Sequence, residues 1–417
     1  MGRWHYLASA FFVLQGVQAF SIVDRLLYGE WQGKPGDKFT QAVAVLMMVT
    51  SLALFGRGFR RIKSVRTGVF LAIGLAGFLL CSAVWSIDPQ TTARGAMLYF
   101  FSVVGMIGIA TNLKSDEYMD LLALICFLAG VSSLVLYAVS PANAFGESGD
   151  FRGIFSQKNV LGEAMAMGAL ASLHGIRTGK RLRGAIFLGL NTIVALRSES
   201  ATSCMTIFVF YGTDRIIALI QKGGAARIIA VGMIILTLPF LIFVAISPES
   251  MLEMLGKDPT LTGRTDIWGY VIPYFYQSPW LGWGYVAFWT QNNPAAVEIA
   301  DSLHWFTPQA HNGLLEMLLH VGIAGTAFFI LLWVRTVWLS LRCMRTSERT
   351  LGISSLLSCV GILLVGVSET VLLVPSEAST GVFFITGLMC ERALRSAQRP
   401  RYSAMRWDVS HGIPVRP

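Results

Sequence analysis

Apolar segments recur along almost the whole of this chain, and they constrain its fold more than any other feature. About twelve can be counted, and most are long enough for a helix that crosses a hydrocarbon layer of about 30 Å. They lie near residues 5–23, 39–56, 67–86, 95–112, 118–140, 159–176, 184–198, 200–220, 227–247, 311–334, 351–374 and 379–391, with the seventh and twelfth short. Because 54% of the 417 residues are hydrophobic and 14% are charged, the sequence predicts an all-α polytopic membrane protein.

Basic residues are concentrated in alternate connections between these segments. The richest runs are Arg57 to Arg66, Arg177 to Arg183, Arg335 to Arg349 and the tail. Cytoplasmic loops of membrane proteins are enriched in Lys and Arg, so we place these connections and both termini in the cytoplasm. This topology explains the net charge of +9, and nucleic acid is not needed as a partner.

One connection on the opposite side is large enough to fold over a substrate. It divides the chain into a bundle over residues 1–247, a large outer loop over 248–310, a second bundle over 311–391 and a basic cytoplasmic tail over 392–417. Apolar residues at helical spacing predict an amphipathic helix from about Thr265 to Tyr276, ended by Ser278 and Pro279. Tryptophans are enriched in this loop, as in a membrane-interface belt or in stacking platforms for a sugar: Trp268, Trp280, Trp283, Trp289 and Trp305.

Cationic residues from distant parts of the chain fall on the same outer side. Arg152 and Lys158 lie beside the start of the sixth apolar segment, where Asn159 is a candidate N-cap and the helix N-terminus favours an anion. Arg152 could instead pair with Asp150 or Glu147.

Two more arginines and a histidine complete this outer set. Arg197 occupies a turn so short that it lies at the membrane surface, where it either faces a polar cavity or snorkels. Arg264 begins the amphipathic helix, and His311 opens the tenth apolar segment. The predicted topology therefore gathers three arginines and an imidazole at one leaflet.

Short motifs around these residues resemble the O-antigen ligase and polysaccharide polymerase superfamily. The matching pieces are Arg152-Gly-Ile-Phe-x-x-Lys158-Asn-x-Leu-Gly162, the Arg-Ser-x-Ser of Arg197 to Ser200, Gly263-Arg264-x-Asp266-Ile-Trp268, Pro279-x-Leu-Gly282-x-Gly284 and His311-Asn312-x-x-Leu315. The resemblance covers roughly residues 150 to 335, and its first motif is more similar to exopolysaccharide polymerases of the succinoglycan type than to ligases acting on lipid A core. The resemblance implies a GT-C-like fold in a bacterial inner membrane, with the active site facing the periplasm.

The resemblance also implies a reaction and roles for residues. Arginines at the positions of Arg152, Arg197 and Arg264, with Lys158, would bind the diphosphate of an undecaprenyl-diphosphate-linked oligosaccharide, and His311 would act at the reacting centre with Arg264. The implied reaction is an inverting glycosyl transfer without a metal or other cofactor, and a flippase and chain-length-control proteins are candidate partners. Contacts to the glycan are assigned to Trp268, His304 and Asp266, although His304 matches none of the motifs.

The residue types suit this chemistry. A guanidinium makes paired, charge-assisted hydrogen bonds to phosphate oxygens, and the sequence has no Asp-x-Asp motif for a divalent ion. A neutral imidazole can accept the proton of a sugar hydroxyl. Polymerisation of exopolysaccharide repeat units is the favoured function. The alternatives are ligation of the glycan to lipid A core, transport of a lipid-linked oligosaccharide, and a structural subunit of a biosynthetic complex.

Overall fold

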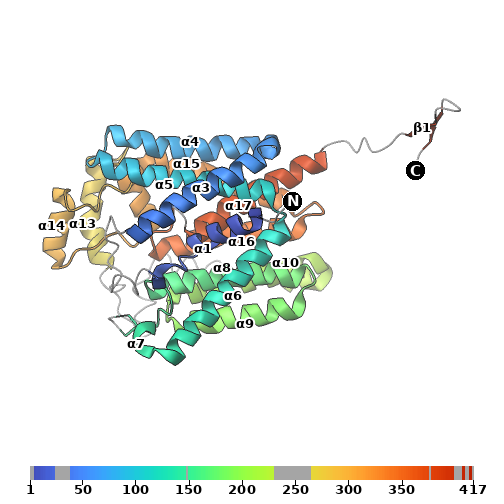
Figure 1. Ribbon diagram of the computed structural model, residues 1–417, viewed down its shortest axis with the longest axis horizontal. Coiled ribbons are helices and arrows are strands. Elements are labelled where there is room, and N and C mark those ends of the chain that lie inside the picture. The colour runs from blue at the N-terminus through green and yellow to red at the C-terminus, as the bar shows by residue number, and fades with distance from the viewer. Residues whose placement is uncertain are drawn as a thin grey trace.

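The computed structural model describes residues 4–23, 38–146, 149–229, 264–374 and 377–398, and the backbone of 406–408 and 413–415. They form a bundle of long helices, with two shorter helices over one of its ends (Figure 1). The bundle helices are α1 (Trp4–Gly16), α3 (Lys38–Gly58), α4 (Arg66–Cys81), α5 (Pro89–Asn112), α6 (Ser115–Val139), α8 (Lys158–Arg177), α9 (Arg181–Arg197), α10 (Ala201–Lys222), α15 (Gly313–Cys343), α16 (Arg349–Ser368) and α17 (Ala378–Gln398). The shorter elements are η1 (Phe59–Val65), η2 (Ser82–Val84), α7 (Pro141–Ala144), α13 (Arg264–Gln277), α14 (Pro294–Leu303) and the antiparallel strands β1 (Arg406–Asp408) and β2 (Ile413–Val415).

The helices agree with the predicted apolar segments over most of the described chain. Six helical segments of this part are long and apolar enough to cross a membrane: Lys38–Val84, Pro89–Asn112, Ser115–Val139, Ala201–Lys222, Gly313–Cys343 and Arg349–Ser368. The first predicted segment is not one continuous helix, because α1 ends at Gly16 and Gln18 adopts a left-handed φ of 57°. The ninth, at 227–247, lies almost wholly outside the described residues. A polytopic helical membrane protein is therefore confirmed, and the total of about twelve spans stays a prediction.

Small residues allow the central helices to pack closely. All residues of α8 from Leu161 to Gly175 are buried. A Cβ atom on Gly162 would lie 2.4 Å from Ser203 Oγ of α10, and one on Gly168 would lie 2.6 Å from Cys126 Cβ of α6. Van der Waals packing of small residues is the main source of helix association in a bilayer, so α8 forms the centre of its half of the bundle.

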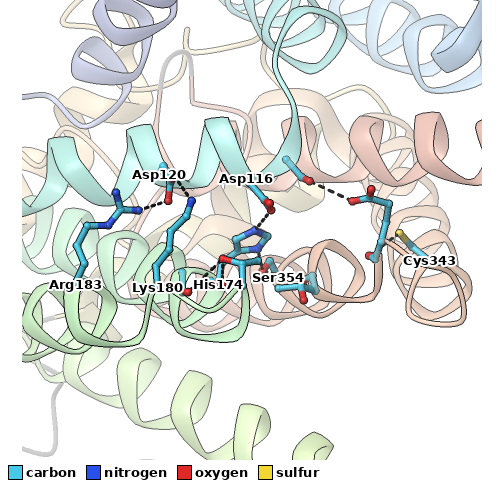
Figure 2. Close-up of polar contacts among 12 residues, drawn as sticks. Asp116, Asp120, His174, Lys180, Arg183, Cys343 and Ser354 are labelled. Atoms are coloured by element: carbon cyan, nitrogen blue, oxygen red, sulfur yellow. Dashed lines mark hydrogen bonds and ion pairs between the residues drawn. The ribbon is translucent and has the colours of Figure 1, made fainter.

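Polar side chains join the helix ends at the end of the bundle where the connection Arg177 to Arg183 lies (Figure 2). His174 of α8 lies between Asp116 of α6, 2.8 Å from Nε2, and Ser354 of α16, 2.9 Å from Nδ1. Asp120 of α6 pairs with Lys180 and with Arg183, which follow α8. Connections that were predicted to share one membrane side therefore do lie together, and their cytoplasmic orientation stays a prediction.

The outer loop is fixed to a break in α15. Gly322 has a φ of 61°, and the amides of Ile323 and Ala324 donate to the carbonyls of Pro279 and Trp280 at 2.8 and 3.1 Å. In return, the amide of Trp283 donates to the Leu319 carbonyl at 2.7 Å. The predicted tight turn is confirmed, with a φ of 69° at Gly282 and 102° at Gly284. This clamp holds the chain that follows α13 against the bundle.

Gly322→Ala should loosen this clamp. A Cβ atom would lie 2.3 Å from the Trp280 carbonyl carbon, and a side chain in this backbone region costs about 1–3 kcal/mol even without a clash. Thermal unfolding of the purified protein in detergent should therefore begin at a lower temperature. Gly212→Ala in α10, where an added Cβ atom would meet no atom within 4 Å apart from its own helix backbone, is the matched control. Equal stability of the two variants would show that the break does not depend on glycine.

Candidate active site

Glu369 is the point at which the outer ends of several helices meet. It caps the C-terminus of α16, and its side chain is 14% exposed. Its Oε1 accepts hydrogen bonds from Arg264 Nη2 at 2.8 Å and from Asn159 Nδ2 at 2.7 Å. Its Oε2 lies 3.8 Å from His311 Nδ1. The structure thus brings Arg264 and His311 together, and it does so through a carboxylate that the sequence analysis did not single out.

Arg264 is placed by the helix that it begins. α13 runs from Arg264 to Gln277, in agreement with the predicted amphipathic helix. Ile267 and Val271 are buried in a small apolar cluster under the outer loop, which fixes this helix by one face. Trp268 donates from Nε1 to the Ala310 carbonyl at 2.9 Å, so it joins α13 to the chain just before His311.

His311 is held from both sides along the chain. The Ala310 amide donates to the buried carboxylate of Glu316 at 2.8 Å, and Asn312 caps α15 by accepting from the Leu315 amide at 3.0 Å. His311 itself has a left-handed φ of 50°, and its Nδ1 lies 3.3 Å from Gln309 Nε2. A non-glycine residue keeps such a backbone only when its surroundings impose it, so the imidazole has a defined position.

Asn159 is not the N-cap of α8. The helix begins at Lys158, and the N-cap is Gln157, which makes no side-chain capping bond. Asn159 instead lies within the first turn and directs its amide to Glu369. The prediction failed because the helix begins one residue before Asn159, which is therefore already helical and cannot be the N-cap. The N-terminus of α8 still lies beside the site.

Lys158 and Arg197 contact other residues at the same end of the bundle. Lys158 pairs with Asp150 at 2.8 Å. The Arg197 guanidinium lies 5.4–5.8 Å from the ring centroids of Phe145, Phe151 and Tyr137, and 3.6 Å from Glu199. Within the described contacts, neither residue reaches Glu369.

The loop of Arg152 and the turn of Arg197 are nevertheless neighbours of the site. Phe151 precedes Arg152 and packs on Arg197, and the Arg152 Nη1 lies 3.5 Å from the Ser156 carbonyl oxygen. The α9–α10 turn is joined to the end of α16 through a hydroxyl contact between Thr202 and Ser368. Convergence of Arg152, Arg197 and Lys158 on one diphosphate stays a prediction.

Two further carboxyl groups lie buried behind Glu369. The Ser379 amide donates to Glu163 of α8 at 3.0 Å, and Gln18 Nε2 donates to Glu377 at 2.8 Å. Burial, together with the charge of the adjacent Glu163, raises the pKa of Glu377 well above its ordinary value. A usable signal existed in the sequence, because ionisable residues inside or beside apolar segments usually have a function or a specific partner.

The remaining predicted glycan contacts lie on the outer loop. Asp266 is exposed in the first turn of α13, and His304 is exposed at the end of α14, where its φ is 60°. Trp268 is partly buried against the apolar cluster. Their roles in glycan binding stay predictions. Trp283 donates to the Tyr274 carbonyl at 3.0 Å and packs within the same cluster.

Comparison with known proteins agrees with the motifs. Residues 184–330 match a family model described as O-antigen ligase, a range that contains Arg197, Arg264 and His311. The chain is also similar to the exopolysaccharide production protein ExoQ of Rhizobium meliloti (strain 1021), with 25% identity over 290 residues. The alignment covers 65% of this chain and spans 65% of the length of that relative. The two matches confirm the resemblance that the motifs indicated, and they support a place for this chain in the O-antigen ligase and polysaccharide polymerase superfamily.

Proposed function

We propose that the protein transfers a glycan from a lipid diphosphate to a sugar hydroxyl at the Glu369 end of the bundle. The observation that carries the proposal is the meeting of Arg264, His311 and Asn159 at one carboxylate, from three distant segments. The family match supports glycosyl transfer of the ligase or polymerase type. We further propose that this end faces the periplasm from a bacterial inner membrane and that the lipid is undecaprenol.

The proposed step is a single inverting displacement. The acceptor hydroxyl passes its proton to His311 while its oxygen attacks the anomeric carbon of the donor sugar. The bond between that carbon and the diphosphate oxygen breaks, and the diphosphate leaves with the bonding electron pair. Arg264 stabilises the negative charge that grows on this oxygen, the role that a divalent ion has in many glycosyltransferases.

Glu369 supports both groups in this proposal. Its hydrogen bond orients the Arg264 guanidinium toward the position of the leaving group. Its second oxygen, 3.8 Å from His311 Nδ1, stabilises the imidazolium that forms when the ring accepts the proton. Glu369 thus acts through Arg264 and His311 as a positioning residue.

Glu369→Gln should slow transfer about 10–100-fold, because a charge-assisted hydrogen bond contributes about 1.5–3 kcal/mol. The change is nearly isosteric, so Asn159 and Arg264 keep an acceptor oxygen and the fold should persist. Turnover of a lipid-diphosphate oligosaccharide by purified protein measures the effect. Unchanged turnover would show that Glu369 has no role in transfer.

Polymerisation is favoured over ligation, since the relative ExoQ is named for exopolysaccharide production. The test supplies purified protein with one defined undecaprenyl-diphosphate oligosaccharide and no other acceptor. A ladder of longer products is expected. Product formation only after lipid A core is added would indicate a ligase. A donor that is moved across a vesicle membrane without any new glycosidic bond would indicate a transporter.

A further inference from the structure

A groove between α13 and α14 lies on the outer loop, away from Glu369. It has a volume of about 510 Å³, within the range of about 300–1,000 Å³ that is typical of ligand sites. Tyr270, Tyr274 and Gln277 of α13 form one wall, and Glu298 and Ile299 of α14 form the other. Neither the family motifs nor the site described above accounts for this groove.

The lining is chemically suited to a sugar. Tyr270 is 42% exposed, and Gln277 and Glu298 are exposed, so aromatic, amide and carboxylate groups are all open to the groove. The Tyr274 hydroxyl donates to Glu298 at 2.7 Å, and burial together with this carboxylate raises the Tyr274 pKa to about 12. The hydroxyl is therefore protonated at neutral pH, and the carboxylate is fixed in orientation.

Three other occupants fit this lining poorly. None of the described residues that line the groove is basic, so it lacks the charge that an anionic headgroup or nucleic acid would need. Lipid chains would leave the Glu298 carboxylate and the Gln277 amide without water, which is costly. Exposed rings beside polar hydrogen-bonding groups suit the apolar faces and hydroxyl groups of a carbohydrate.

The groove and the candidate active site share one helix. Arg264 is the first residue of α13, and the lining residues Gly269 to Gln277 follow it. At about 1.5 Å per residue, they begin about 8 Å and end about 20 Å from Arg264 along the helix axis. A glycan of a few sugar units whose end lies at Arg264 can span this distance.

We propose that the groove between α13 and α14 is a binding subsite for uncharged sugar units of the glycan chain, several units away from the reacting end. The class of ligand rests on the proposed function. The subsite itself binds the sugar part alone and needs neither the diphosphate nor transfer. A glycan bound there is held while its end reacts, which favours repeated addition to the same chain.

The test measures binding of an uncharged oligosaccharide fraction, released by mild acid from the host's own exopolysaccharide and free of lipid and phosphate. The oligosaccharide is titrated into full-length protein in nanodiscs, and its binding is followed by saturation-transfer NMR. Tyr270→Ala should raise the dissociation constant roughly tenfold through loss of the stacking face. Glu298→Gln should also weaken binding. Trp280→Ala, which removes a more exposed ring of the same loop (69% against 42% for Tyr270) outside the groove, should leave binding unchanged.

The outcomes separate this proposal from the proposed function. The subsite is supported if Tyr270→Ala and Glu298→Gln weaken oligosaccharide binding and Arg264→Ala does not. This holds even if the purified protein forms no polymer. The subsite proposal is overturned if neither groove variant alters oligosaccharide binding, or if the wild-type protein binds no oligosaccharide. This holds even if a product ladder forms. In a protein that polymerises, Tyr270→Ala should also shorten the products without slowing the first transfer.

Discussion

Replacing Arg264 with alanine should lower the rate of glycosyl transfer about 10²–10³-fold, the loss seen when one preorganised donor to a developing anion is removed. Arg264 is partly buried and bonded to Glu369, so its guanidinium is already oriented before substrate arrives. Its loss would also leave the Glu369 carboxylate without that partner beside the diphosphate, and like charges would repel. The measurement is single-turnover transfer from a defined lipid-diphosphate oligosaccharide.

Arg264→Lys separates the shape of the guanidinium from its charge. A lysine keeps the positive charge and cannot reproduce a bidentate contact, so transfer should still be clearly impaired. Full activity of Arg264→Lys would mean that the residue provides only electrostatic attraction. Full activity of both variants, in protein that elutes as wild type on size exclusion, would contradict the assignment.

His311→Ala should reduce transfer about 10²–10⁴-fold, the usual contribution of a general base. Donor binding should be nearly unchanged, because the imidazole acts on the acceptor hydroxyl. The rate of transfer at saturating donor should therefore fall while the donor concentration for half-maximal rate stays similar. This split distinguishes a catalytic base from a residue that only shapes the binding site.

His304→Ala is the matched control for the histidine. His304 lies exposed at the end of α14 and outside the Glu369 contacts. Its replacement should have a much smaller effect than that of His311. If His304→Ala stopped transfer and His311→Ala did not, the base would have to be reassigned to the outer loop.

Hydropathy was enough to predict the architecture around this site. Burial of backbone polar groups in a bilayer forces helices, so long apolar runs such as residues 95–112 and 118–140 could be assigned without tertiary information. Helical spacing of Ile267 and Val271 likewise predicted α13, and the glycines after Pro279 predicted the turn that clamps to α15. These features depend on local sequence, or follow directly from the apolar interior of the bilayer.

The side-chain contacts at the outer ends of the helices could not be predicted from the sequence in the same way. Glu369 joins residues 105, 58 and 210 positions away along the chain; a carboxylate inside the apolar segment 351–374 indicates that it has a partner and does not indicate which residue that is. The three aromatic rings beside Arg197 were not predicted either, and its expected contact with a diphosphate stays a prediction. Such contacts depend on how helices pack, which periodicity does not specify.

Affinity for undecaprenyl diphosphate without any sugar tests the central claim most directly, because it isolates the leaving group from the chemistry. The measurement compares wild type, Arg264→Ala and His311→Ala in nanodiscs. Loss of a charge-assisted contact should weaken binding about 10–100-fold in Arg264→Ala, and His311→Ala should bind as wild type does. Equal affinity of wild type and Arg264→Ala would contradict a diphosphate site at Glu369.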